Sequence, residues 1–426
     1  MAFAQPPKIQ LSVDRLGMQG DGIARWDNQA VYIEGALAGE VVEVSISQDK
    51  QGVLRGRLLS VIDESPDRQS PPCIHYEICG GCSTQHLNQT AYQQWTTDKI
   101  HALFDAKEVK PRQWLDPIFI FEQTRRRVTF VASKVGGNVI IGYNQRRSHQ
   151  FFDAPKCLLP ELDLMQLRHD LLPYLERILP HKKLCDVFIQ KCDNGFDVCL
   201  TGLVGAQKKP DLTVLETAAD MVRALPIIRL SWRLRDKDEP EVMLETAKPY
   251  VMFGDLSVPV PPLAFLQPSM AGQVALMDVV RNAIPNEIKK AADLFSGCGT
   301  FTGVLRQGGM QVDAFEGEEQ AITALKSAGH HTAFKRDLFQ NPLTGNELDA
   351  YDLVVIDPPR AGAKAQSEML ADSSVRTIIA VSCNPATFVR DAQILMDGGY
   401  VLEIAQIVDQ FIWSDHVELV GVFARK

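Results

Sequence analysis

Apolar residues recur with two different periods along this chain, and the change between them divides it. Between residues 8 and 62, short runs alternate apolar and polar side chains, and glycine-rich or charged breaks separate the runs. Alternation with a period of two is typical of half-buried strands, so this segment is predicted to form a small β-barrel. From residue 261 onward, apolar strand-like runs alternate with segments of helical spacing. That pattern predicts an α/β domain with a doubly wound sheet.

The segment between these two parts mixes both periods. Helical spacing marks residues 91–104 and 162–179, and strand-like runs follow at residues 187–190, 196–200, 227–233 and 242–245. At 426 residues the chain is too long for one ordinary domain. We therefore expect three domains: the β-barrel at residues 1–63, a central α+β domain at residues 64–260 and the α/β domain at residues 261–426.

Composition narrows the class of protein. Apolar residues make up 45% of the chain, as in soluble globular proteins, and no run approaches the roughly 18 apolar residues that a membrane span needs. We therefore expect a cytoplasmic protein without membrane contact. The net charge of −9 excludes an overall basic surface but leaves room for a local basic patch. Nine cysteines in a cytoplasmic chain indicate metal binding, catalysis or burial rather than disulfides.

One group of cysteines has a spacing suited to a metal centre. Cys73, Cys79 and Cys82 lie close together, two glycines separate the last pair, and Cys157 is a candidate fourth ligand. Four thiolates suit either zinc or a [4Fe–4S] cluster. The chain lacks two Cys-x2-Cys pairs, so a plain zinc ribbon is the weaker choice. The Cys-x3-Cys-x2-Cys pattern of radical enzymes is also absent.

The most basic part of the chain lies in the central segment. Arginines and aromatic residues are interleaved there, and the set comprises Arg125, Arg126, Arg127, Arg146, Arg147 and His149 with Tyr143, Phe151 and Phe152. Phosphate contact combined with base stacking would use this mixture. A solvated charged face is an equally good interpretation, because charge runs usually serve that purpose.

A cysteine follows one of the buried strands of the α/β part. Residues 377–381 read as a strand, Pro385 forces a turn, and helical spacing follows. Cys383 is therefore predicted at the carboxyl end of a strand and just before a helix, where open α/β sheets bind ligands. A thiol near a helix N-terminus can have a lowered pKa and act as a nucleophile. The alternative is a small buried cysteine in a turn.

Acidic residues follow three further strands of this part. A glycine-rich turn at residues 296–299 leads into a helix, and Glu316 ends the next strand, where a carboxylate can hold ribose hydroxyls. A dinucleotide-binding fold predicts the same pair. Asp337 follows a third strand, where it could reach an adenine amino group, and Asp357 ends a fourth strand before two prolines.

Several of these motifs resemble those of RNA-modifying enzymes. Residues 20–25 and 34–40 resemble the TRAM module, an OB-like barrel. The Asp357-Pro-Pro motif resembles the fourth-strand motif of S-adenosylmethionine methyltransferases, which favours a methyltransferase over a dehydrogenase. The four cysteines match the cluster pattern of bacterial 5-methyluridine RNA methyltransferases. The whole chain is similar to the RNA uracil-5-methyltransferase family, closest to the subset with a TRAM barrel and an iron–sulfur cluster, which acts on 23S ribosomal RNA.

The resemblance implies a fold and roles for individual residues. It implies a Rossmann-like class I methyltransferase domain, Cys383 as nucleophile, Glu418 as general base, and a [4Fe–4S] cluster on Cys73, Cys79, Cys82 and Cys157. S-adenosylmethionine contacts are implied for Gln267, Phe295, Thr300, Glu316 and Asp337, with Asp357 as the acid of the site, and Gln267 is open to contact with uracil instead. Ser296 stands where the family usually has cysteine, and residues 411–414 depart from the family's pattern before His416.

The implied reaction is methylation of carbon 5 of a uridine in RNA through a covalent cysteine–uracil intermediate. Carbon 5 of uracil is a poor nucleophile until a thiolate adds to carbon 6, and a base must then remove the proton from carbon 5. The target base must be everted or single-stranded. We expect a monomer acting on ribosomal RNA. Transfer RNA as the substrate and a non-catalytic RNA-binding assembly factor are the alternatives, and the intact Cys383 and Glu418 motifs argue against the second.

Overall fold

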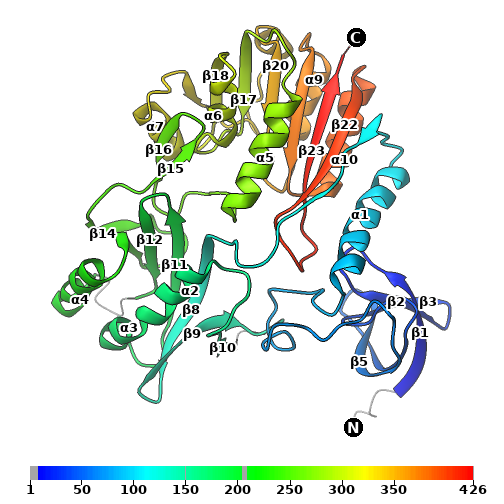
Figure 1. The fold of residues 1–426 in the computed structure, drawn as a ribbon, viewed down its shortest axis with the longest axis vertical. Coiled ribbons are helices and arrows are strands. Elements are labelled where there is room, and N and C mark those ends of the chain that lie inside the picture. Colours follow the sequence, from blue (N-terminus) through cyan, green and yellow to red (C-terminus); the bar gives the residue numbers. More distant parts are fainter. Residues whose placement is uncertain (1–7, 149, 204–208, 426) are drawn as a thin grey trace. The chain divides into compact units, whose positions relative to one another are not determined.

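The computed structural model describes residues 8–148, 150–203 and 209–425, so His149 of the basic set lies outside the described residues. The chain divides into two compact units (Figure 1). The first comprises Met1–Ala106 and Phe411–His416, and the second comprises Lys107–Gln410 and Val417–Lys426. Within the described residues, no helix is long and apolar enough to cross a membrane.

The first unit begins with the predicted β-barrel. Five strands close in the order β1-β2-β3-β5-β4, with bounds β1 Lys8–Leu16, β2 Gly22–Trp26, β3 Gln29–Ile33, β4 Val41–Gln48 and β5 Leu54–Asp63. Inward side chains such as Val13, Val31 and Val44 form its core. Gly56 allows close packing there, because a Cβ at this position would lie 2.8 Å from Ile33. The period-two alternation of the sequence is therefore confirmed as a closed barrel.

Turns, one helix and a distant segment complete the first unit. Residues 64–88 form mainly turns and bends, and α1 (Gln89–Ala106) follows. The carbonyl oxygen of Trp413 accepts hydrogen bonds from the backbone N–H groups of Ser83 at 2.8 Å and Thr84 at 3.3 Å. Lys99 Nζ donates to the carbonyl oxygen of Asp415 at 3.2 Å. These bonds tie residues 411–416 to residues early in the chain.

The second unit contains a mixed sheet from the central segment. Seven strands lie in the order β10-β9-β8-β11-β12-β13-β14, with bounds β8 Arg127–Val135, β9 Asn138–Asn144, β10 Phe151–Asp153, β11 Leu184–Cys192, β12 Gly195–Thr201, β13 Ile227–Arg233 and β14 Glu241–Glu245. Apolar residues of α2 (Leu162–Asp170), α3 (Leu172–Ile178) and α4 (Leu212–Ala224) share one core with this sheet. One helix was predicted where α2 and α3 form, and Pro173 in the first turn of α3 explains the break.

A nine-stranded sheet forms the rest of the second unit. Its order is β19-β18-β17-β20-β21-β23-β22-β6, and β7 also pairs with β22. The bounds are β6 Gln113–Trp114, β7 Ile118–Phe119, β17 Lys290–Leu294, β18 Gln311–Glu316, β19 Ala333–Lys335, β20 Leu353–Ile356, β21 Thr377–Ser382, β22 Val401–Asp409 and β23 Glu418–Ala424. All neighbours are parallel except β23, which runs antiparallel between β21 and β22. The last strand of the chain therefore occupies an interior place in the sheet.

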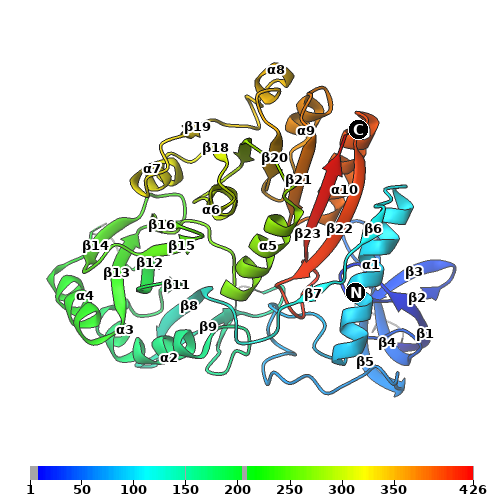
Figure 2. The same cartoon turned by 45° about the horizontal axis from the view of Figure 1, so that its top comes forward.

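Helices cover both faces of this sheet, as predicted for a doubly wound fold (Figure 2). Val420 of β23 belongs to the core that the sheet shares with α5 and α6, whereas Phe423 lies against Phe388 of α10, with ring centroids 6.3 Å apart. Residues an odd number of positions apart on a strand face opposite sides, so α5 and α10 cover different faces. The helices are α5 Met270–Ala283, α6 Thr300–Gln307, α7 Glu319–Ser327, α8 Gly345–Leu348, α9 Lys364–Ala371 and α10 Pro385–Asp397, and a hairpin of β15 (Tyr250–Phe253) and β16 (Leu256–Pro259) precedes α5.

Candidate active site

Cys383 lies where the sequence predicts it, in the turn between β21 and α10. Pro385 is the first residue of α10 and Asn384 is its N-cap, with Asn384 Oδ1 accepting from the backbone N–H of Ala386 at 3.1 Å. Asn384 Nδ2 donates to the carbonyl oxygen of Arg360 at 2.9 Å. The cap therefore fixes the cysteine turn and also ties it to the loop after β20. The Cys383 side chain is half-buried.

Glu418 starts β23, the strand beside β21, and Cys383 directly follows β21. Ser382 of β21 pairs with Leu419 of β23, so the two predicted catalytic residues lie at adjacent strand ends. Glu418 is only 3% exposed. Burial raises the pKa of its carboxyl to about 7, although a hydrogen bond from Gln410 and the charge of Arg360 act in the opposite direction. At neutral pH this group exchanges a proton readily, which suits a general base.

Asp357 shares the environment of Glu418. Its side chain is partly exposed, yet the protein around it and the charge of Glu418 hold its pKa well above the usual range. Burial and the charges of Glu418 and Asp357 raise the pKa of the Cys383 thiol to about 11. The position before a helix suggested a lowered pKa, and that expectation is wrong here. Two nearby carboxyl groups and burial outweigh the helix terminus, which contributes only within its first turn.

A glutamine that the sequence reasoning did not single out joins two of the predicted residues. Gln410 Nε2 donates to Gln267 Oε1 at 2.7 Å and to Glu418 Oε1 at 3.2 Å. All three side chains are buried, and Gln410 links Gln267 to Glu418 through these two hydrogen bonds. Gln410 follows β22 and belongs to the same sequence motif as Glu418, which is the signal that could have found it.

The glycine-rich turn after β17 holds the carboxylate of Glu316. Gly297 N donates to Glu316 Oε2 and Glu318 N donates to Glu316 Oε1, both at 2.9 Å. Gly299, the N-cap of α6, has φ +96°, and a Cβ there would lie 2.4 Å from Leu325. A positive φ and this close approach both require glycine. The backbone of the turn is therefore open to a ligand, and Thr300 begins α6 directly after it.

Phe295 and Asp337 lie on the same edge of the sheet. Phe295 has φ +59°, which is uncommon for a non-glycine residue, and its ring lies 5.2 Å from that of Phe339. Asp337 Oδ1 accepts from the backbone N–H groups of Phe339 at 3.0 Å and Gln340 at 3.3 Å. One turn thus positions the carboxylate of Asp337 and an aromatic ring beside Phe295. Asp337 itself is exposed, so a ligand can reach it.

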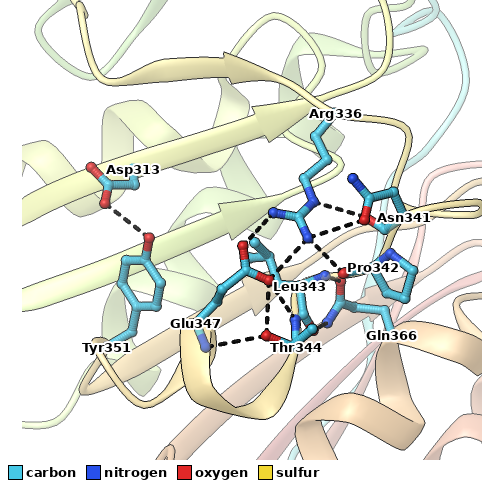
Figure 3. Close-up of polar contacts among 9 residues, drawn as sticks. All are labelled: Asp313, Arg336, Asn341, Pro342, Leu343, Thr344, Glu347, Tyr351 and Gln366. Atoms are coloured by element: carbon cyan, nitrogen blue, oxygen red, sulfur yellow. Dashed lines mark hydrogen bonds and ion pairs between the residues drawn. The ribbon is translucent and has the colours of Figure 1, made fainter.

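A network of hydrogen bonds and ion pairs surrounds Arg336, the residue before Asp337 (Figure 3). Arg336, next to Asp337, donates to both carboxylate oxygens of Glu347 at 2.6 and 3.0 Å, and to the carbonyl oxygens of Asn341 at 2.8 Å and Pro342 at 2.7 Å. Glu347 also completes a capping box with Thr344 at the start of α8. These bonds lower the pKa of the Glu347 carboxyl to about 2, with Arg336 as the main cause. The Thr-x-x-Glu spacing was the only sequence signal for this brace.

One further buried acid in this region was missed. Asp293 is fully buried in β17 and accepts a hydrogen bond from Thr302 Oγ1 at 2.5 Å. Burial is the main cause that raises the pKa of its carboxyl to about 7; the charges of Asp357 and Glu316 act in the same direction, and hydrogen bonds from Thr302 oppose the shift. A single acid within an apolar strand was the available signal. Asp293 ties β17 to α6 beneath the glycine-rich turn.

The four cysteines of the predicted cluster fall in different units. Cys73, Cys79 and Cys82 belong to the first unit and Cys157 to the second. Among the described residues, no three His, Cys, Asp or Glu side chains are grouped closely enough to hold a metal. Gly81 N donates to Cys79 Sγ at 3.4 Å, and burial raises the pKa of the Cys79 thiol. The [4Fe–4S] cluster therefore stays a prediction.

Two members of the basic set have structural partners. Arg126 is 1% exposed, and its Nε donates to the carbonyl oxygen of Gln267 at 3.0 Å. Arg127 Nη1 donates to the carbonyl oxygen of Leu266 at 3.1 Å, and its guanidinium lies 4.6 Å from the centre of the Phe265 ring. Neither interpretation of the basic run, RNA contact or a solvated face, fits Arg126, because its guanidinium holds the backbone beside Gln267.

Sheet order, the glycine-rich turn and the acid at the end of β18 define a methyltransferase of the Rossmann-like class. The TRAM domain model matches residues 8–59, and the tRNA (Uracil-5-)-methyltransferase family model matches residues 321–426. An uncharacterised RNA methyltransferase of Mesorhizobium japonicum is 35% identical over 98% of both chains. The chain belongs to the RNA uracil-5-methyltransferase family.

One further protein is similar in sequence, and one solved structure is similar in fold. The chain is 28% identical to the 23S rRNA (uracil(1939)-C(5))-methyltransferase RlmD of Aeromonas hydrophila, over 99% of this chain and 97% of that one. Among solved structures, it is similar to the tRNA (uracil-54, C5)-methyltransferase of Pyrococcus abyssi in complex with S-adenosyl-L-homocysteine. That similarity has a TM-score of 0.75 at 20% identity and covers 97% of this chain and 99% of the other. It shows the shared fold.

Proposed function

We propose that this chain methylates carbon 5 of a uridine in RNA, with S-adenosylmethionine as methyl donor and 23S ribosomal RNA as substrate. The observation that carries the proposal is the meeting of Cys383 and Glu418 at adjacent strand ends, with Asp357 in the same environment. The RlmD relative favours ribosomal over transfer RNA. A non-catalytic assembly factor would have no need of a buried carboxyl whose pKa is near 7 beside a cysteine.

Each residue has a task in this reaction. Cys383 is the nucleophile: its thiol releases its proton to solvent and the sulfur adds to carbon 6 of uracil, which makes carbon 5 nucleophilic. The bound donor supplies a methyl group on a sulfonium. Glu418 then takes the proton from carbon 5, and the electrons left behind expel the Cys383 thiolate from carbon 6. The Asp357 carboxyl group, which lies in the same environment, is able to hydrogen-bond the base.

The donor site is proposed at the edge formed by Glu316, Asp337, Phe295 and Thr300. Glu316 lies in the position that holds ribose hydroxyls in related folds, and Asp337 is exposed beside two aromatic rings. Gln267 is proposed, by its sequence motif, to contact either the donor or the target uracil. Glu316→Ala and Asp337→Ala should each weaken binding of S-adenosylhomocysteine at least tenfold in calorimetry, because each removes a hydrogen-bonded carboxylate. Unchanged binding in both variants would place the donor elsewhere.

The central test is the fate of Cys383. Cys383→Ala should lose methyl transfer and also lose covalent trapping by RNA with 5-fluorouridine at the target, while retaining its fold. Cys199→Ala is the control, because Cys199 is a buried cysteine of β12, outside the proposed active site. Glu418→Gln should accumulate a methylated covalent adduct, since the sulfur cannot leave before the proton is removed. Methyl transfer by Cys383→Ala would contradict the proposal.

The RNA substrate can be identified from the 5-methyluridine that is missing when the gene is deleted. Nuclease digestion and mass mapping of 23S ribosomal RNA and of transfer RNA from a deletion strain should show one 5-methyluridine missing from the ribosomal RNA. Its loss from transfer RNA instead would leave the chemistry intact and change the substrate. The TRAM barrel is proposed as an RNA-binding element, since such barrels commonly hold nucleic acid on a strand face.

The iron–sulfur cluster is a separate part of the proposal. Soft thiolate ligands and the Cys-Gly-Gly-Cys spacing support a [4Fe–4S] centre on Cys73, Cys79, Cys82 and Cys157. Protein purified without oxygen should contain about four iron and four sulfide per chain by this assignment. Stoichiometric zinc without iron would contradict it. Cys185→Ser, at a buried cysteine of β11, is the control for each of the four cysteine-to-serine variants.

Three domains, at residues 1–63, 64–260 and 261–426, are also proposed, together with a monomeric state. Limited proteolysis should cut near residues 63 and 260, and sedimentation should give a single species of 47.3 kDa. Cleavage confined to other places would move the boundaries.

A further inference from the structure

Gln410 stands between the proposed base and the glutamine of the substrate site. Its two Nε2 hydrogens are used by Gln267 Oε1 at 2.7 Å and by Glu418 Oε1 at 3.2 Å. Its own Oε1 is buried and has no hydrogen-bond partner among the described residues. The polar groups of a buried amide normally all form hydrogen bonds. Here the two N–H groups of Gln410 are paired, whereas its carbonyl oxygen is not.

The donation from Gln410 decides which way the amide of Gln267 points. Because Gln267 Oε1 accepts from Gln410, the Nε2 of Gln267 lies on the other side of the amide. That Nε2 donates no hydrogen bond to any residue the structure describes. The backbone of Gln267 is also fixed, since its carbonyl oxygen accepts from Arg126 Nε at 3.0 Å. Gln267 therefore presents two unused N–H donors in a fixed direction.

The charge of Glu418 is the origin of this direction. An ionised carboxylate only accepts hydrogen bonds, so Gln410 has to turn its Nε2 toward Glu418. The same nitrogen also donates to Gln267, so the side-chain atom of Gln267 that faces it has to be the acceptor, Oε1. Gly272 of α5 makes room for the amide, because a Cβ there would lie 2.3 Å from Gln410 Oε1. Glycine inside a helix is costly, and here it permits this close approach.

We propose that Gln410 is a specificity-determining positioning residue that orients the Gln267 amide so that its N–H donors face the target base. Uracil has a carbonyl oxygen at carbon 4, which accepts such a bond, whereas cytosine has an amino group there, which would meet another donor. This inference rests on the proposed function and deepens it by assigning Gln267 to the base. A site built to donate to a carbonyl rejects the amino analogue because two donors are left facing each other.

The test compares two RNAs that differ only in the target base, which carries a carbonyl oxygen at carbon 4 in one and an amino group there in the other. Each carries the target as 5-fluorouridine or 5-fluorocytidine, and the rate of covalent adduct formation is measured for both with the methyl donor present. The ratio of the two rates is the readout, because a general loss of activity or stability lowers both rates together. The unmutated chain should favour the uridine analogue by about a hundredfold or more, as expected of a polar readout.

Gln410→Met keeps the volume of the side chain and removes the donor, so the ratio should fall at least tenfold by the same reasoning. Gln410→Glu should turn the Gln267 amide over and shift the ratio further toward cytidine. Gly272→Ala, which displaces the Gln410 amide without removing it, should act in the same direction as Gln410→Met. Gln406→Met is the matched control, since Gln406 is buried on β22 and donates to the carbonyl oxygen of Asp116 at 2.9 Å.

The outcomes separate this inference from the proposed function. A ratio within twofold of the unmutated chain in both Gln410→Met and Gly272→Ala would overturn the role of Gln410. Failure of the unmutated chain to form an adduct with either RNA would overturn the proposed function instead. A fall in the ratio for Gln406→Met as large as that for Gln410→Met would also count against the inference, because it would reflect loosening of β22.

Discussion

At the scale of single residues, burial raises the pKa of both groups of the proposed chemistry, but it leaves them in different protonation states near neutral pH. The Glu418 carboxyl has a pKa of about 7, so it changes protonation near neutral pH. The Cys383 thiol has a pKa of about 11, so it stays protonated until a base is available. A protonated thiol reacts more slowly with oxidants than a thiolate does, so the proposed nucleophile would be protected in the absence of RNA.

The rate of methyl transfer should rise with pH as Glu418 ionises. A base acts only when deprotonated, so the single-turnover rate is expected to increase from pH 5.5 and to bend near pH 7. Asp357 and Glu418 interact, so the bend belongs to the pair. Rapid-quench measurements between pH 5.5 and 9 test this. A rate that is flat across pH 7 would mean that proton removal by Glu418 does not limit the reaction.

Glu418→Gln should stabilise the fold at high pH. The folded-state pKa of about 7 lies above the ordinary value of 4.5 for a glutamate carboxyl, so the folded chain holds the proton more tightly than the unfolded chain. Stability therefore falls as pH rises from 4.5 to 7, and removing the charge should recover about 1–3 kcal/mol at pH 8. Urea unfolding at pH 5 and pH 8 measures this. Glu368→Gln, at an exposed residue of α9, should show no such gain.

The sequence predicted these two residues but not their environment. Cys383 and Glu418 stand in motifs that can be read along the chain, whereas Gln410 matters because it touches Gln267, which is 143 residues away. Asp293, Arg126 and Arg360 act through contacts of the same non-local kind. The expected lowering of the Cys383 pKa failed for the same reason, because the nearby carboxyl groups come from other strands.

At the scale of elements, α6 links the glycine-rich turn to the hairpin of β15 and β16. Gly303 sits in the middle of α6 at the point of contact, where a Cβ would lie 2.0 Å from the carbonyl oxygen of Phe253. Helix and hairpin are therefore in direct backbone contact there. Thr300 begins this helix, and Thr302 of the helix donates a hydrogen bond to Asp293 of β17. The distance between α6 and the hairpin therefore also affects the shape of the proposed donor site.

Gly303→Ala should destabilise the second unit by about 1–3 kcal/mol, because overpacking forces helix and hairpin apart. The midpoint of urea unfolding should fall, and binding of S-adenosylhomocysteine should weaken with it. Gly345→Ala is the matched control, since the nearest atom to a Cβ at that helical glycine is 3.4 Å away, an ordinary contact. Equal effects of the two substitutions would show that close approach at Gly303 is unimportant.

Elements were predictable where the pattern was local. The barrel strands and the alternation of the nine-stranded sheet follow from periodicity alone, since each strand carries its own apolar pattern. The short strands β6 and β7 were not predicted, because two residues hold no period and their pairing with β22 depends on distant sequence. The break between α2 and α3 was readable from Pro173 and was missed.

At the scale of the whole molecule, the chain forms two units that can be tested separately. In the first, Glu40 is completely buried and accepts hydrogen bonds from Leu37 N at 2.7 Å and Arg68 Nη2 at 2.8 Å. Glu40 is thus a buried charge that is paired with a cation from outside the barrel strands. Residues 411–416 also belong to this unit, a non-local grouping that periodicity along the chain does not reveal.

Glu40→Ala should destabilise the first unit by about 3 kcal/mol, because it leaves the Arg68 guanidinium without its buried partner. Hydrogen exchange should show lost protection in β1–β5 and retained protection in β17–β23. Burial acts to raise the pKa of Glu40, but hydrogen bonds from Arg68, Leu37 N and Ser65 N and the charge of Arg68 together lower it. Its contribution is therefore present above pH 4.5 and lost as pH falls through the folded-state pKa. Asp14→Ala, at an exposed pair with Arg25, should change stability by less than about 0.5 kcal/mol.

The placement of β23 fixes the order in which this sheet can be completed. The ribosome makes β21 and β22 before the strand that lies between them, and that strand begins with Glu418. A nascent chain that has exposed only β21 and β22 therefore already carries Cys383 but still lacks the proposed base. We expect such a chain to be unable to complete the proposed reaction, so the nine-stranded sheet has to close before turnover can begin.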